Sequence, residues 1–63
     1  MLKYFKQILS KVSFDKVLFE KELKKAIKSL LPTELKELKD WCYNKFGELY
    51  RLILDRNFAA LKV

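Results

Sequence analysis

The last third of the chain carries its longest run of helix-spaced apolar residues. Apolar side chains recur there every three or four positions, the spacing that gathers them on one side of an α-helix. The stripe consists of Leu35, Leu38, Cys42, Phe46, Leu49 and Ile53. It predicts an amphipathic helix over about residues 33–58, entered either with Pro32 at its first position or with Thr33 as its N-cap.

Gly47 leaves two interpretations open for this helix. Glycine often ends a helix as its C-cap, and this helix would then stop at Phe46. Inside a helix, glycine costs about 1 kcal/mol relative to alanine. We favour the interior position because the apolar stripe keeps its phase across Gly47. An unbroken helix of this length would measure about 40 Å, at a rise of about 1.5 Å per residue.

Two further helices are predicted before Pro32. Over about residues 2–12, apolar residues recur at helical spacing and the lysines fall on the opposite side, which predicts an amphipathic helix of about three turns. A second helix is expected over about residues 14–30, with Ser13 as its candidate N-cap. It should end near Leu30, because the residue before a proline avoids the helical backbone region.

These segments predict an all-α protein, a small three-helix unit made of a short N-terminal helix and an antiparallel helical hairpin. A chain of 63 residues forms one domain with a small core, whose stability is marginal. Cys42 is the only cysteine and there is no histidine, so we expect neither an internal disulfide nor a zinc site to add stability. Oligomerisation is therefore expected to complete a helical bundle.

The third predicted helix carries more apolar surface than one short partner helix can cover. This surplus predicts an interface with a second copy of the chain, as a homodimer, or with a partner protein. Trp41 is the expected anchor, because its indole combines a large apolar body with a polar N–H. The residues assigned to this interface are Trp41, Tyr43, Tyr50, Leu52, Leu54 and Phe58.

Positive charge is concentrated in the first half of the chain. Residues 1–31 hold eight lysines and three acidic residues, a net charge of +5 out of +6 for the whole chain. Lysines opposite the apolar side of the second helix repel one another, and such a face suits contact with nucleic-acid phosphates. A solvated surface is the more common reason for such a cluster. The lysines concerned are Lys21, Lys24, Lys25 and Lys28.

The residue types that catalysis needs are scarce. The chain has no histidine and one glycine, so it lacks a glycine-rich phosphate loop and an activated nucleophile. Glu34, Glu37 and Asp40 are expected to complement the helix dipole, and Cys42 to pack as a small apolar side chain. We expect no enzymatic activity, no catalytic residue, no cofactor, no metal and no small-molecule substrate.

The N-terminal region lacks the apolar run of a signal peptide or a transmembrane span, which leads us to expect a cytoplasmic protein. A membrane-surface role for residues 2–12 is disfavoured, because the same apolar side can dock on the third helix. The leading hypothesis is a small non-enzymatic helical module for protein interaction and assembly. The alternative is a small basic nucleic-acid-binding protein that uses the lysine face of the second helix.

Overall fold

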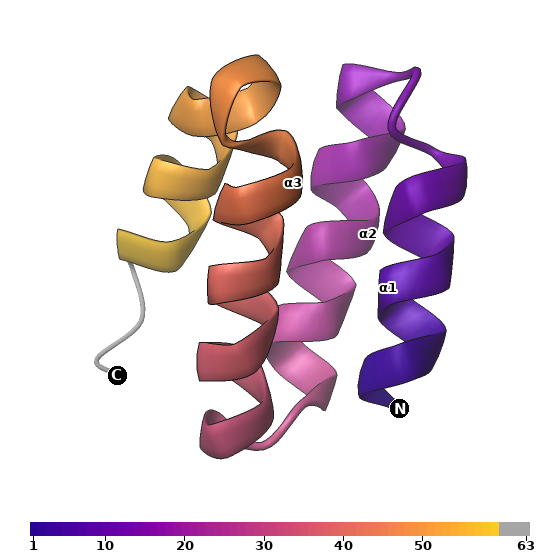
Figure 1. Cartoon of the computed structure of the whole chain (residues 1–63). Coiled ribbons are helices and arrows are strands. Elements are labelled where there is room, and N and C mark those ends of the chain that lie inside the picture. Colours follow the sequence, from indigo (N-terminus) through magenta and orange to yellow (C-terminus); the bar gives the residue numbers. More distant parts are fainter. Residues whose placement is uncertain (60–63) are drawn as a thin grey trace.

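The computed structural model describes residues 1–59, which form three α-helices and no strand. The helices are α1 (Leu2–Lys11), α2 (Lys16–Ser29) and α3 (Pro32–Ala59), and successive helices run antiparallel (Figure 1). The predicted all-α, three-helix unit is thereby confirmed. Among residues 1–59, no helix is long and apolar enough to cross a membrane.

The start of α2 differs from the prediction, because Asp15 rather than Ser13 is its N-cap. The Asp15 carboxylate accepts hydrogen bonds from the backbone N–H groups of Val17 (2.9 Å) and Leu18 (3.2 Å). Ser13 instead donates its hydroxyl to the carbonyl oxygen of Ser10 (2.9 Å), at the end of α1. Both residue types make good caps, but a carboxylate also interacts favourably with the positive end of the helix dipole.

Pro32 occupies the first position of α3, which decides between the two predicted ways of entering this helix. Proline fits there because its missing N–H would have no partner inside the helix. The preceding backbone N–H, of Leu31, donates to the side chain of Glu34 (3.1 Å), one half of a capping box. Since α2 ends at Ser29, the turn between the two helices is tight and sets them side by side.

The prediction of an unbroken third helix is wrong, because α3 bends at Tyr50. This residue has non-helical backbone angles (φ −123°, ψ 29°), and the chain beyond it folds back along the preceding turns (Figure 1). Tyr43 donates its hydroxyl to the carboxylate of Asp55, and its ring centroid lies 6.3 Å from that of Phe58. In a straight helix, residues fifteen positions apart would be separated by about 22 Å.

Burial explains why the helix doubles back. The Cα atoms extend 26 Å along the longest axis of the molecule, so a helix of about 40 Å would leave its end in water. The bend instead buries Ile53, Leu54 and Phe58, which are 6%, 0% and 3% exposed. Each contributes about 1.5–3 kcal/mol, more than the about 0.5–1.5 kcal/mol of a helical hydrogen bond lost at the bend. Gly47 does lie inside the helix, and the break comes three residues later.

One hydrophobic core joins the three helices. Phe19 of α2 is fully buried, and its ring stacks on Tyr50 (centroids 4.6 Å apart) and meets Phe46 edge-on (5.1 Å). From α1, Phe5 and Leu9 enter the same core. The remaining buried apolar members are Leu23, Ala26, Leu30, Leu35, Leu38, Cys42, Ile53, Leu54 and Phe58. The apolar side of α1 is therefore occupied by packing within the chain.

Candidate functional site

The six residues predicted as one interface do not form one surface. Tyr50, Leu54 and Phe58 lie in the core, where they are 8%, 0% and 3% exposed, so they are not accessible to a partner of the folded chain. Trp41 is half-buried, on the side of α3 that faces α1. Leu52 is 82% exposed and is the one member that the structure leaves fully open. The bend at Tyr50 causes this redistribution, because it turns the end of α3 onto its own beginning.

Tyr43 is also half-buried, and its hydroxyl is engaged within the chain. Burial and the hydrogen bond to the Asp55 carboxylate raise the pKa of Tyr43 to about 12. The neutral phenol is the form that can donate this bond, so the contact holds at neutral pH. Tyr43 therefore fastens the two parts of α3 to each other.

Glu20 connects the returned part of α3 to α2. Its carboxylate accepts hydrogen bonds from the Asn57 amide (2.9 Å) and from the Arg56 guanidinium (2.5 Å to Nη2 and 3.1 Å to Nε). These hydrogen bonds lower the pKa of Glu20, the one from the Asn57 side chain by the most and the one from Arg56 next. This three-residue contact holds the end of the chain against the bundle.

Exposed apolar side chains gather at the end of the molecule where α3 bends. The connection between α1 and α2 lies at the same end, as Figure 1 shows, and the Tyr50 hydroxyl donates to the Ser13 carbonyl across it. Leu49 and Leu52 line a shallow hollow here together with Lys16, the first residue of α2. We call the four most exposed apolar residues here the apolar end: Phe14 (81%), Val17 (72%), Leu49 (68%) and Leu52 (82%).

Sequence reasoning missed two members of the apolar end. Phe14 and Val17 fall outside the apolar stripe of the second helix, and they were not assigned to any surface. An apolar residue out of phase with its helix is a usable signal, since such a residue points away from the core. The apolar stripe predicted for the third helix includes Leu49, and this assignment is wrong. Because the helix bends here, Leu49 is 68% exposed and its neighbour Tyr50 is buried instead.

The predicted lysine face is present on α2 and is open to solvent. All four of its lysines are exposed: Lys21, Lys24, Lys25 and Lys28. Lys25 pairs with Glu22 at 3.5 Å, which removes part of the repulsion along the face. The one aromatic residue of α2, Phe19, is fully buried, so this face offers charge without a stacking surface.

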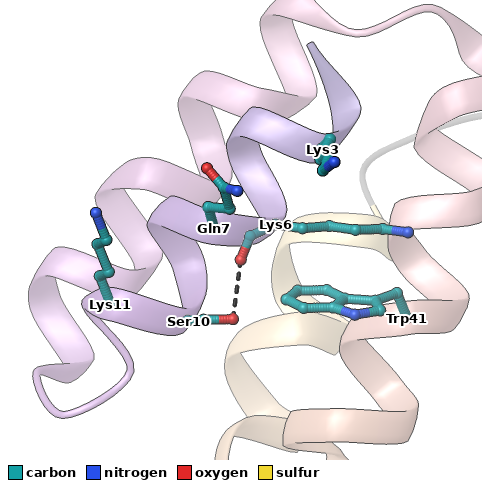
Figure 2. A pocket seen from close by; sticks show the side chains of 6 residues that line it. All are labelled: Lys3, Lys6, Gln7, Ser10, Lys11 and Trp41. Carbon is teal, nitrogen blue, oxygen red and sulfur yellow. Dashed lines mark hydrogen bonds between the residues drawn. The ribbon is translucent and has the colours of Figure 1, made fainter.

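A second basic surface lies between α1 and α3, around Trp41. Figure 2 shows the indole on one side of an open groove whose other side is formed by α1. The ammonium groups of Lys6 and Lys45 lie 5.8 Å and 5.4 Å from the centroid of the Trp41 ring. The lining residues are Lys3, Lys6, Gln7, Ser10, Lys11 and Trp41.

Cys42 is enclosed in the core beside this groove. The side chain is fully buried, and burial raises the pKa of its thiol to about 12. A thiol in this state is protonated at neutral pH and unreactive. Within residues 1–59, no group of three or more cysteine, histidine or acidic side chains is arranged to hold a metal ion.

Comparison with known proteins gives no relative for this chain. No family model matches the sequence, and neither a curated protein nor a solved structure is significantly similar to it. The functional proposals below therefore rest on the residues and contacts of the chain itself.

Proposed function

We propose that this protein is a small helical assembly module that associates with a second copy of itself through the apolar end. The observation that carries this proposal is the exposure of four large apolar side chains, each 68–82% exposed, at one end of the molecule. Leu52 belongs to the interface predicted from the sequence, and the bend of α3 places it beside Leu49 in the same hollow as Lys16.

The area of the apolar end suits a second copy of the chain. Its four side chains together expose on the order of 500 Å² of apolar surface, an area comparable to the largest apolar patch of an ordinary monomer. Leu49 and Leu52 share the hollow, while Phe14 precedes α2 and Val17 belongs to its first turn, at the same end of the molecule. A stable interface buries about 800 Å² on each partner, so the apolar end would form the centre and polar neighbours the rim. Such an interface would cover nearly a fifth of the 4535 Å² surface of the chain.

The size of the chain also favours a second copy of itself as the partner. A core built by 63 residues without a disulfide supplies little stability to spare, and dimerisation is a common remedy in domains of this size. The residues at the rim are mostly basic, namely Lys16, Arg51 and Arg56 beside Glu48. Arg51 and Arg56 are paired within the chain, with Asp55 (3.9 Å) and with Glu20 (2.5 Å), so the rim has little net charge to oppose the approach of a second copy.

The mass of the purified chain in solution, measured by light scattering over a dilution series, tests the proposal. We expect a dimer that dissociates on dilution, and a Leu52→Lys variant whose dissociation constant is at least about 10-fold higher, because a buried ammonium lacks a partner. Leu31→Lys is the matched control, since Leu31 is 66% exposed at the opposite end of the molecule. A parent chain that stays monomeric, or equal weakening by both variants, would contradict the proposal.

A further inference from the structure

The groove between α1 and α3 combines positive charge with an aromatic ring, and the proposed dimerisation does not use it. Three lysines of α1 line it, Lys3, Lys6 and Lys11, and no carboxylate does. Within residues 1–59, none of these lysines takes part in an ion pair. Like charges gathered without a partner lower stability, which makes the groove a candidate for binding an anion.

Trp41 is held in position for contact with a ligand. Its ring packs edge-on against the core residue Phe46, with centroids 5.6 Å apart and an interplanar angle of 79°. The ammonium group of Lys45 lies over the indole ring, 5.4 Å from its centroid, and donates to the Ser10 hydroxyl of α1 (3.4 Å). The indole is thus supported by the core on one edge, while Figure 2 shows the Lys6 side chain extended over the ring on the groove side. A base that stacks on this face takes the place of the Lys6 stem, whose ammonium group can then pair with a phosphate.

We propose that this groove binds single-stranded nucleic acid, with a base stacked on Trp41 and the backbone phosphates on the lysines of α1 and on Lys45. Bases stack on aromatic side chains with little dependence on the nucleotide sequence, and lysines contact the backbone phosphates whatever that sequence is. Lys3 and Lys11 are about 12 Å apart along the helix axis. This separation allows them to contact phosphates on both sides of the nucleotide whose base stacks on Trp41. A duplex keeps its bases stacked internally and offers Trp41 no face to contact.

The shape of the groove favours a nucleic acid over an anionic membrane surface. A membrane-binding helix inserts protruding apolar side chains between lipids, with lysines above them. Here Phe5 and Leu9 of α1 are 5% and 0% exposed, Trp41 is half-buried in a hollow, and Tyr4, the exposed aromatic residue of α1 (55%), does not line the groove. A flat ligand that enters the hollow reaches the indole more readily than a lipid surface does.

Trp41 is the only tryptophan in the chain, so its fluorescence reports directly on the groove. We expect a single-stranded oligonucleotide of about 12 nucleotides to quench this fluorescence at about 50 mM salt. Inorganic polyphosphate should leave the fluorescence nearly unchanged, because it offers phosphates without bases. The proposal would be overturned if the oligonucleotide did not quench the fluorescence, or if polyphosphate quenched it equally. It would also be overturned if the protein bound vesicles of anionic lipid but not the oligonucleotide.

Two triple variants with the same change in charge separate a local site from general attraction by a basic protein. In the groove variant, Lys3, Lys6 and Lys11 are replaced by glutamine, and in the control Lys21, Lys24 and Lys28 of α2 are replaced likewise. Binding of a labelled oligonucleotide is followed by anisotropy over a salt series. The groove variant should lower the slope of log K against log salt by about 2, since each lost phosphate contact removes about 0.7.

The control variant should keep most of its slope and most of its affinity at low salt. Equal losses in the two variants would overturn the groove as the site, and a loss in the control alone would assign binding to the α2 face. Trp41→Ala should weaken binding about 10-fold at constant salt slope, and Trp41→Phe should restore much of it by keeping a ring. Circular dichroism of each variant checks that the helices are retained.

Discussion

The two parts of α3, before and after Tyr50, have similar apolar spacing but different surroundings. Before the bend, Leu35, Leu38 and Cys42 face α1 and α2 as a single stripe, as the sequence predicts. After the bend, Ile53 and Leu54 are buried against other parts of the chain, while Leu52 is exposed. Helical spacing describes which residues share a side within a segment, but it does not fix how that side turns at a break.

The fold-back also decides which surface remains for a partner. A straight α3 would have offered a long apolar face, including Leu54 and Phe58, for another chain to cover. The bend consumes that face within the chain and leaves Leu49 and Leu52 at the bend itself. The interface expected along a helix is therefore proposed at one end of the bundle.

The largest effect is expected from Phe19, whose ring contacts residues on both sides of Gly47 in α3. Phe19→Ala should lower the free energy of unfolding by about 3–5 kcal/mol, enough to unfold much of a domain of this size. Urea denaturation followed by circular dichroism measures this. Leu31→Ala is the control, since Leu31 is 66% exposed, lies outside the proposed interface and should change the stability by less than about 0.5 kcal/mol. Similar values for the two variants would show that the shared core is misassigned.

Tyr50→Phe tests the contact that fixes the bend to the α1–α2 connection. The phenylalanine keeps the ring in the core but cannot donate to the carbonyl of Ser13, which is part-buried. We expect a loss of about 1–2 kcal/mol in the free energy of unfolding. Tyr4→Phe, at a tyrosine that is 55% exposed, should have little effect. An unchanged stability for Tyr50→Phe would mean that packing alone holds the bend.

Gly47→Ala distinguishes a helix interior from a hinge. A Cβ atom at Gly47 would meet nothing within 4 Å, and this glycine does not have a positive φ. Alanine should therefore raise the free energy of unfolding by about 0.5–1 kcal/mol, through its better helix propensity. Thermal unfolding measures the shift. A lower melting temperature would place the break of α3 at Gly47 rather than at Tyr50.

Glu20→Gln tests the attachment of the returned segment to α2. Because folding lowers the pKa of Glu20 below its ordinary 4.5, the carboxylate stabilises the fold above that pH. This contribution is lost as the pH falls through the lowered pKa. At neutral pH the variant should lose about 0.2–1 kcal/mol, the usual range for an exposed ion pair, and in acid the two chains should converge. Glu37→Gln, at an exposed position, should change little at either pH, and a constant difference across the titration would exclude this role for the carboxylate.

Much of the local structure could be predicted from the sequence. The Leu31–Pro32 pair located the turn between α2 and α3, because proline excludes the helical backbone from the residue before it. The position of Gly47 inside a helix also followed from the phase of the apolar residues on either side. The N-cap of α2 did not follow, because Asp15, which caps the helix, has nearly the same preference for that position as the predicted Ser13.

The candidate surfaces could be predicted only in part. The lysines of α2 were found because their spacing places them on one side of a single helix, and that side is open to solvent. The groove at Trp41 was not found, because it needs Lys6 of one helix and Lys45 of another to meet at the same ring. Contacts between elements depend on how the helices are docked, which local spacing does not specify.

The sequence by itself determined that this chain forms helices, where they begin and end to within a few residues, and that it carries a strong positive charge. Those properties depend on local backbone preferences and on the order of apolar and polar residues. The tertiary structure alone decided that α3 doubles back at Tyr50, that Leu54 and Phe58 belong to the core, and that Leu52 stays exposed. These outcomes depend on how much apolar surface the whole chain can bury, a quantity that no single segment contains.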